Sequence, residues 1–224
     1  MIDYVLTRSR RKTIAIYIRD GRVEVKAPLK AAKSDIERFL SEKQKWINDN
    51  LVKSKEQSEQ KKSFTLNYGD LVLYCGKQYA ITANQSGKIG VSNDCFFVPA
   101  GLLAEQIKDT CVRIYKILAK SDLTLKVYDY AAKMGVAPSA VKVNSATSRW
   151  GSCSSKRSLN FSWRLIMADD DVIDYVVVHE LSHLREMNHS PKFWAIVESV
   201  LPDYRERKAK LRELQAKLNS EDWE

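Results

Sequence analysis

All three histidines of this 224-residue chain fall within eleven consecutive positions of the stretch VVVHELSHLREMNHS, residues 176–190. They are His179, His183 and His189. Side chains four residues apart on a helix project from the same face. His179 and His183 can therefore hold one metal ion, with nitrogen–metal distances of about 2.0–2.1 Å. The residue types and their spacing predict a metal site.

Glu180 follows the first histidine directly and lies about 100° further around the helix axis. At that angle it does not share the face of the histidine pair, but its carboxylate can reach a water molecule on the metal. This is the chemistry of the H-E-x-x-H pattern, in which the glutamate takes a proton from metal-bound water. We therefore expect Glu180 to be the catalytic base of a hydrolase.

The third metal ligand is expected to be His189, because its distance from His183 matches the extended zincin pattern H-E-x-x-H-x-x-x-x-x-H. Metzincins have a glycine where Glu186 stands, and here Asn188 is the residue best suited to a left-handed turn. Glu198, further along the chain, is the competing candidate. Three neutral imidazoles leave an open fourth position, as a catalytic zinc requires.

Zinc is the expected metal, and another divalent ion is the alternative. The competing interpretation is that the histidines are ordinary core residues. Burying three imidazoles at one helix end without a shared partner is costly, which argues against it. Metal affinity should fall below pH ~6, because each imidazole must lose a proton near its reference pKa of ~6.5.

The histidine pair requires a helix, and the sequence predicts one over residues 169–187. Asp169, Asp170 and Asp171 favour a helix N-terminus through capping and the helix dipole. The apolar residues that follow lie on more than one side of the helix, so it should be largely buried.

The preceding chain reads as a hairpin, a helix, short strands and further helices. Alternation on both sides of Asp20 and Gly21 predicts the hairpin. A helix is expected over about residues 34–53, followed by an exposed linker over about residues 53–63. Short strands should follow up to about residue 98, then a helical stretch in two pieces ending at Gly135. Because strands and helices are segregated, we expect an α+β fold.

The composition is that of an ordinary globular protein, with 44% hydrophobic and 29% charged residues. There is no apolar run of the ~20 residues needed to cross a bilayer, and the first residues lack a signal-peptide core. The four cysteines form no C-x-x-C pair. This pattern fits a reducing compartment, and a cytoplasmic location is expected by default.

The net charge of +9 is concentrated at the N-terminal end of the sequence. Residues 1–62 contain 16 Lys and Arg against 9 Asp and Glu, whereas residues 136–200 contain 7 of each. The basic N-terminal third could make weak contact with the phosphates of a nucleic acid. The alternative is a solvated basic face, which is favoured because no groove-reading motif accompanies the charge. No membrane contact is expected.

Two longer stretches, SRWGSCSSKRSLNFSWRLIMA (148–168) and YVVVHELSHLREMNHSPKFWAIV (175–197), closely resemble the YgjP-like metal-dependent hydrolase family, which is related to the SprT-like and WLM metallopeptidases. The N-terminal segments RKTIAIYIRDGRVEVKAP and FLSEKQKWI resemble the opening module of that family, so the resemblance covers most of the chain. Two departures are visible. The family often has glycine where Arg157 stands and proline near Asp169.

The resemblance implies a zincin-like core, in which a small antiparallel sheet packs on the H-E-x-x-H helix. An N-terminal β-rich module with one helix, residues 1–98, should precede a zincin-like metallohydrolase domain, residues 99–224, and the two can pack as one unit. The segment NFSWRL (160–165) would be a strand able to pair with an extended peptide.

Four residues are expected to contact the substrate or the transition state: Arg149, Trp150, Asn160 and Arg164. Arg149 could stabilise an oxyanion or a phosphate, or equally cap a helix or pair with an aspartate. Trp150 could serve the site or the core.

Three functions follow. The first is metal-dependent peptide hydrolysis with Glu180 as the base. The resemblance also implies an alternative, a nucleoside triphosphate pyrophosphatase acting on a UTP-like substrate at the same metal. Lys156 and Arg157 would then join Arg149 and Arg164 around the polyphosphate. The third is a metal-stabilised binding module without catalysis, in which Glu180 would have no purpose.

Overall fold

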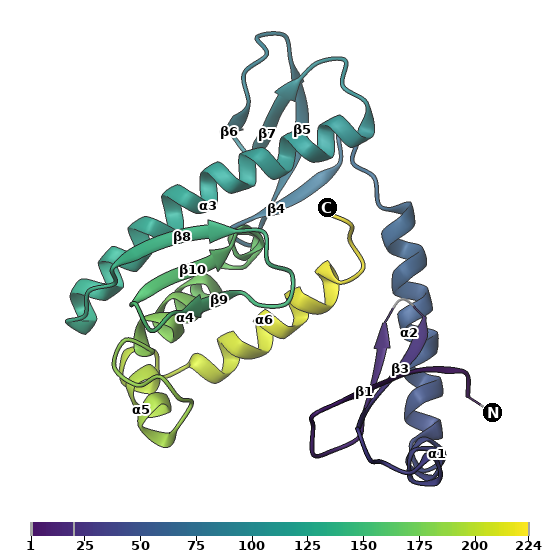
Figure 1. Ribbon diagram of the computed structural model, residues 1–224. Coiled ribbons are helices and arrows are strands. Elements are labelled where there is room, and N and C mark those ends of the chain that lie inside the picture. The colour runs from purple at the N-terminus through teal and green to yellow at the C-terminus, as the bar shows by residue number, and fades with distance from the viewer. Residues whose placement is uncertain (1, 20, 224) are drawn as a thin grey trace. The chain divides into compact units, whose positions relative to one another are not determined.

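The computed structural model describes residues 2–19 and 21–223, which form two compact units. Unit 1 comprises the described residues up to Phe64 together with residues 217–222, and unit 2 comprises residues 65–216 and Trp223. Both contain helices and strands (Figure 1), which confirms the α+β class. Within the described ranges, no helix is long and apolar enough to cross a membrane.

Unit 1 contains a three-stranded sheet in the order β1-β3-β2. Its strands are β1 (Tyr4–Ser9), β2 (Ala15–Arg19) and β3 (Arg22–Pro28). Strands β2 and β3 pair antiparallel, as the alternating pattern predicted, although Asp20 of the expected turn lies outside the described residues. Strand β1 pairs parallel to β3. It was not predicted, because its side chains are mostly exposed and show no alternation.

Two helices complete unit 1, α1 (Lys33–Glu42) and α2 (Gln44–Ser63). Ile36, Leu40 and Ile47 form one core with buried residues of β3. The expectation of one helix followed by a linker over residues 53–63 was wrong, because α2 is helical to Ser63. Lys, Glu and Gln are good helix formers, so a segment with little apolar content can stay helical in solvent.

Unit 2 begins with a four-stranded sheet in the order β4-β5-β7-β6. Its strands are β4 (Leu71–Tyr74), β5 (Lys77–Asn84), β6 (Gly90–Ser92) and β7 (Cys95–Pro99). The Tyr115 hydroxyl donates to the Leu73 carbonyl over 2.6 Å, and the Phe96 ring lies 5.0 Å from the Tyr115 ring. This sheet therefore belongs to unit 2, and the units divide after residue 64, whereas the sequence suggested a boundary near residue 98. Residues 64–69 form no strand.

A single helix of 31 residues, α3 (Ala104–Met134), replaces the two helical pieces that were expected. Its buried face includes Ile107, Ile114 and Leu123. The helix ends at Gly135, which has φ 61° and ψ 41°. This is the left-handed C-terminal glycine that the sequence predicted.

The sheet nearest the histidines has the strand order β8-β10-β9. Its strands are β8 (Ala140–Asn144), β9 (Gly151–Cys153) and β10 (Ser158–Ser162). Strand β10 runs parallel to β8 and antiparallel to β9, so the sheet is mixed rather than wholly antiparallel. The reason is that β10 turns back from β9 and inserts beside β8, which runs in the same direction.

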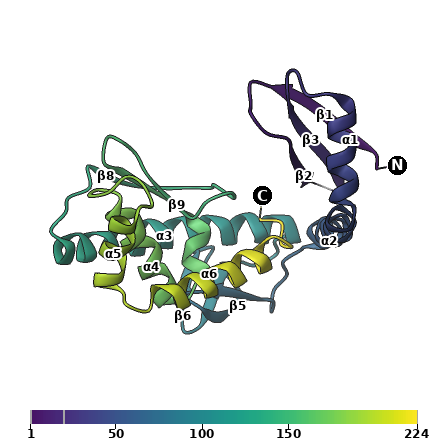
Figure 2. The same ribbon diagram turned by 90° about the horizontal axis from the view of Figure 1, so that it is seen from below.

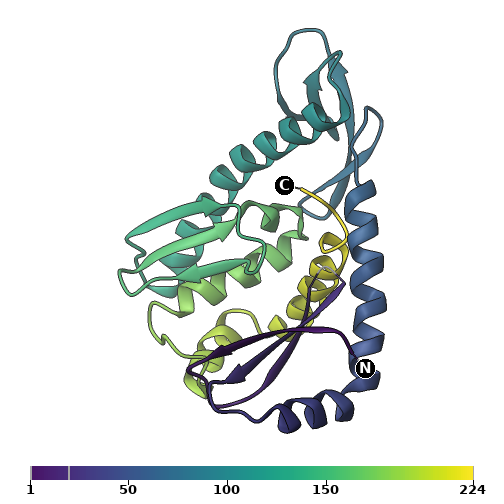
Figure 3. The same ribbon diagram turned by 45° about the vertical axis from the view of Figure 1, so that its right-hand side comes forward.

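The chain then forms a buried 3-10 helix and three α-helices. They are η1 (Trp163–Met167), α4 (Asp170–Ser182), α5 (Pro191–Val200) and α6 (Tyr204–Leu218). The sheet of β8, β10 and β9 lies against α4 (Figure 3). Leu159 and Phe161 of β10 are fully buried. This sheet and α4 position the candidate site.

Candidate metal centre and active site

Helix α4 carries His179 and Glu180, and His183 is its C-cap residue, because the helix ends at Ser182 and not at residue 187 as expected. It starts after Asp169 with Asp170 and Asp171 in its first turn, as predicted, but the Asp169 side chain makes no capping hydrogen bond. Its apolar residues are buried on several sides: Val172, Ile173, Tyr175, Val176, Val177, Val178 and Leu181. This packing holds the helix firmly under the sheet.

The three histidines come together at the C-terminal end of α4. Their candidate ligand nitrogens all lie within 4.8 Å of one another, and Nε2 of His179 is 3.0 Å from Nε2 of His189. Two nitrogens that share a tetrahedral zinc lie about 3.3 Å apart, so this separation fits one shared ion. Nδ1 of His183 donates to the Glu186 carbonyl over 3.2 Å, which leaves Nε2 free as a ligand. These residues can hold a divalent metal.

Aromatic rings from α5 hold the triad in place. Phe193 is fully buried, and its ring lies 4.6–4.8 Å from all three imidazole rings. Trp194 lies 5.8 Å from His189, with the two rings inclined by only 24°. The hydroxyl of Ser190 caps α5 by accepting from the N–H of Phe193 over 3.3 Å. The cap fixes the chain between His189 and these two rings.

The surroundings keep two of the imidazoles neutral. Burial is the main cause that lowers the pKa of His179 to about 3, and positive charge on neighbouring groups acts in the same direction. Burial also lowers the pKa of His183. Neutral imidazole is the form that binds metal, so both residues are ready to act as ligands at pH 7.

Glu180 lies beside the triad and is only 5% exposed. Burial raises the pKa of its carboxyl group to about 7. Among the described residues, none donates a hydrogen bond to its buried Oε2 atom. A general base needs a free acceptor atom and a pKa near the working pH, and Glu180 meets both conditions.

Strand β9 runs directly over Glu180. A β-carbon at Gly151 would lie 2.6 Å from both Cγ and Oε1 of Glu180, so only glycine fits at this position. The thiol of Cys153, two residues along, has its pKa raised by burial and then by the negative charge of Glu180. The motif RWGSC therefore lies at the site.

Glu198 lies apart from the triad. Its Oε1 is 3.5 Å from a guanidinium nitrogen of Arg205. Among the described side chains, the group at metal-ligand distance consists of the three histidines, so the geometry favours His189 over Glu198. Asn188 is not among the described residues with positive φ. The turn into His189 therefore forms without the left-handed residue that was expected.

Of the four residues expected to contact substrate, two lie beside β9, the strand that covers Glu180. Arg149 and Trp150 directly precede β9; the first is exposed and the second is partly buried. Asn160 alternates along β10 with the buried Leu159 and Phe161. Because neighbours along a strand face opposite sides, the Asn160 side chain points away from α4.

Two of the candidate cations are engaged by the protein itself. Arg164 is 8% exposed, and its guanidinium donates to the Ser145 carbonyl over 3.3 Å. The guanidinium of Arg157 donates to the carbonyls of Ala137 and Leu184 over 3.1–3.3 Å. These two cations support the fold; the other two candidates, Arg149 and Lys156, are exposed and donate no side-chain hydrogen bond to a described residue.

The segment NFSWRL does not present a free strand edge, so this part of the prediction was wrong. Strand β10 ends at Ser162 and lies between β8 and β9, and residues 163–167 form the 3-10 helix. Strands β8 and β9 form the two edges of this sheet, and β9 is the edge strand that lies against Glu180. The residues flanking β9, Trp150 and Ser154, are hydrogen-bonded to β10 over 2.8 and 3.0 Å. Because backbone groups alternate in direction, those of Gly151 and Cys153 point away from β10.

Sequence reasoning missed three contributors to the site. Two of them could have been found from the sequence: Gly151 stands inside the motif RWGSC, and Phe193 stands four residues after His189. No sequence pattern pointed to the third, Lys208 on α6. Its Nζ lies 4.8 Å from the ring centroid of Trp194, because α6 returns beside α4 and α5 (Figure 2).

Comparison with known proteins places the chain in a family. The model of the YgjP-like metallopeptidase domain matches residues 12–214. The zymogen of abylysin from Pyrococcus abyssi is 20% identical, with a TM-score of 0.39, over 45% of this chain and 98% of that chain. The zymogen of jannalysin from Methanocaldococcus jannaschii is 19% identical, with a TM-score of 0.38, over 41% and 95%. No curated protein matches. The protein belongs to the YgjP-like metallopeptidase-domain family.

Proposed function

We propose that the protein is a zinc-dependent peptidase in which His179, His183 and His189 hold the metal and Glu180 is the general base. One observation carries this proposal. A buried glutamate with a free acceptor atom lies beside a cluster of three imidazoles and beneath the free edge of a strand. The family supports the reaction class.

Each residue has a defined task. A bound zinc acidifies water and polarises a carbonyl group. Oε2 of Glu180 takes the proton from the attacking water and then passes it to the nitrogen of the leaving amine. The low exposure of Glu180 keeps bulk water from competing for this proton. Phe193 and Ser190 hold His189 in place through ring contact and capping.

The free edge of β9 supplies a place for the substrate. The backbone N–H and C=O groups of Gly151 and Cys153 point away from β10, and they can pair with an extended peptide by strand addition. Gly151 lies against Glu180, so a peptide paired there would pass beside the base. This is why we favour a peptide over a compact substrate.

The nucleotide alternative, a pyrophosphatase for UTP-like substrates, receives less support. A polyphosphate needs several free cations around the metal, yet Arg157 and Arg164 donate to backbone carbonyls. A binding module without catalysis would leave the burial of Glu180 and its raised pKa without a purpose. The four free cysteines support a reducing compartment such as the cytoplasm.

A substrate screen tests the proposal. The zinc-loaded protein is incubated in parallel with a peptide library and with UTP and other nucleoside triphosphates, and a chelated sample serves as the control. We expect cleaved peptides and intact nucleotides in the zinc-loaded sample only. Zinc-dependent pyrophosphate release without peptide cleavage would contradict the proposal.

A further inference from the structure

Lys208 brings a positive charge close to the candidate metal centre. It lies in α6 and is partly buried, and its Nζ is 4.8 Å from the ring centroid of Trp194. The Trp194 ring in turn lies 5.8 Å from both His179 and His189. Trp194 thus contacts both the ammonium group of Lys208 and two rings of the triad.

The other cations in the first two turns of α6 are neutralised by carboxylates. Arg205 pairs with Glu198 at 3.5 Å, and Arg207 pairs with Asp203 at 2.9 Å. Lys210 also has an acidic partner, at 2.8 Å. Within the described ranges, no carboxylate or hydrogen-bond acceptor is paired with Lys208, whose partner is an aromatic ring. Among the described cations of these two turns, Lys208 is thus the one without a carboxylate partner.

With a metal bound at the triad, the ammonium group of Lys208 and the dication would be like charges separated by the region of Trp194, which is unfavourable for the resting protein. The like charges repel one another in surroundings that screen them less than bulk water does. A contact with the Trp194 ring offsets only part of this cost, since cation–π contacts contribute about 0.5–2 kcal/mol. The charge becomes favourable when an anion lies between or beside the two cations.

We propose that Lys208 binds a carboxylate of the substrate, so that the site selects peptides with a negative charge close to the scissile bond. This inference rests on the proposed peptidase function. The carboxylate can belong to an acidic side chain or to the C-terminus of the peptide, because both present the same acceptor oxygens to an ammonium group. The Trp194 ring holds the ammonium group of Lys208, which limits the freedom lost on binding.

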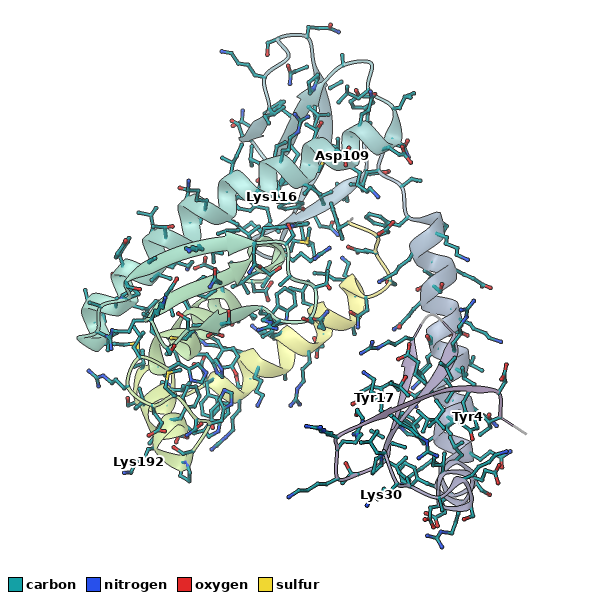
Figure 4. All side chains as sticks on the ribbon, in the orientation of Figure 1. Tyr4, Tyr17, Lys30, Asp109, Lys116 and Lys192 are labelled. Atoms are coloured by element: carbon teal, nitrogen blue, oxygen red, sulfur yellow. The ribbon has the colours of Figure 1, made fainter. Side chains whose placement is uncertain are left out.

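The test uses binding as well as turnover. Matched peptides carry Glu or Gln next to the cleaved bond, each with a free or an amidated C-terminus. Their affinities for the zinc-loaded Glu180→Gln protein are measured by calorimetry, with and without Lys208→Met. The control is Lys192→Met, which removes a lysine on α5 that is exposed and points away from the helix (Figure 4).

We expect Lys208→Met to weaken binding of the charged peptide about tenfold, as the loss of one charge-assisted contact should do, and to leave the neutral peptide within about twofold. In the active protein the same change should raise KM with little effect on kcat. Lys208→Arg should restore most of the preference, and Lys192→Met should change neither peptide. The Glu/Gln and acid/amide pairs show which carboxylate is bound.

The outcomes distinguish a failure of the proposed role of Lys208 from a failure of the proposed peptidase function. Equal binding of charged and neutral peptides by the zinc-loaded protein would contradict the role of Lys208 alone. Peptides that neither bind nor are cleaved would contradict the peptidase function, and the role of Lys208 with it. Zinc affinity gives a further check, since removing the ammonium should leave it unchanged or increase it, and a loss of zinc would indicate a structural role instead.

Discussion

Burial favours the neutral form of both the Glu180 carboxyl group and the His179 imidazole. It raises the pKa of Glu180 to about 7, and it is the main cause of the fall in the pKa of His179 to about 3. A dication held by the histidines would bring positive charge beside Glu180 and favour its carboxylate form. Binding of the metal thus prepares the base that accepts the proton.

The identity of the third ligand can be tested by metal content. His189→Ala should lose zinc as completely as His183→Ala, because each removes one of three ligands, and the described part of the chain offers no fourth His, Cys, Asp or Glu in this group. Glu198→Ala should keep a full equivalent, because that carboxylate pairs with Arg205. Elemental analysis of the purified variants gives the answer. Zinc retained in His189→Ala and lost in Glu198→Ala would reverse the assignment.

Proton release on zinc binding tests the histidine environment. At pH 5.5, three imidazoles with ordinary pKa values near 6.5 would release nearly three protons. The pKa of His179 is about 3, so it is already neutral at pH 5.5. We therefore expect fewer than two protons from Glu180→Gln, measured by calorimetry in buffers of different ionisation enthalpy. The wild type should release about one more, because Glu180 is protonated at this pH until zinc binds. Release of nearly three protons by Glu180→Gln would contradict this.

The triad and Glu180 could be predicted because their geometry is local. The periodicity of one helix fixes His179, Glu180 and His183, and a short connection limits where His189 can lie. Asn160 and Arg164 could not be placed in the same way. Their orientation depends on which strand is central and on where β10 gives way to the 3-10 helix.

At the scale of elements, the contact between β9 and α4 decides whether the base is free to act. Gly151→Ala would put a methyl group on top of Glu180, and displacement of a catalytic group by about 1 Å can cost up to ~100-fold in rate. We expect kcat to fall by 10- to 100-fold while zinc content stays complete. The matched control is Ser152→Ala in the same strand, on its opposite face. Equal activity of the two variants would show that β9 does not constrain Glu180.

Sequence patterns predicted the elements that depend on local residue patterns, but they did not predict the order of strands in a sheet, which depends on pairing between distant segments. The β2–β3 hairpin, the start of α4 and the end of α3 followed from alternation, aspartates and a glycine. Arg157 has φ 61°, which accounts for the glycine that the family often has there. The order of β8, β9 and β10 depends on contacts between distant segments, and no single stretch of sequence encodes it.

At the scale of the whole molecule, several of the basic residues in unit 1 have partners within that unit. Arg8 donates to three backbone carbonyls, and Arg19 lies 3.9 Å from Glu24. Arg19 and Lys26 also contact the ring of Tyr17. These partners favour a solvated basic face, and contact with nucleic acid stays a prediction without structural support.

The end of the chain closes the core of unit 2. The ring of Trp223 is 5.5 Å from Tyr115 and 6.0 Å from Trp163, and Trp223 is only 6% exposed. Trp223→Ala should cost unit 2 about 3–5 kcal/mol of unfolding free energy. Trp46→Ala, at a position that is 47% exposed, should cost much less. Denaturant unfolding measures the stability of both variants. Equal losses of unfolding free energy in Trp223→Ala and Trp46→Ala would contradict the packing role of Trp223.

The most direct test of the proposed mechanism compares the wild type with Glu180→Gln on a peptide that the wild type cleaves, with zinc per chain measured on the same samples. Glutamine has nearly the same shape as glutamate but cannot accept the proton. We predict one zinc per chain and the same fold in both proteins, with kcat at least ~100-fold lower in the variant, as expected for a missing general base. Unchanged turnover in a fully zinc-loaded Glu180→Gln protein would contradict the assignment of Glu180 as the base.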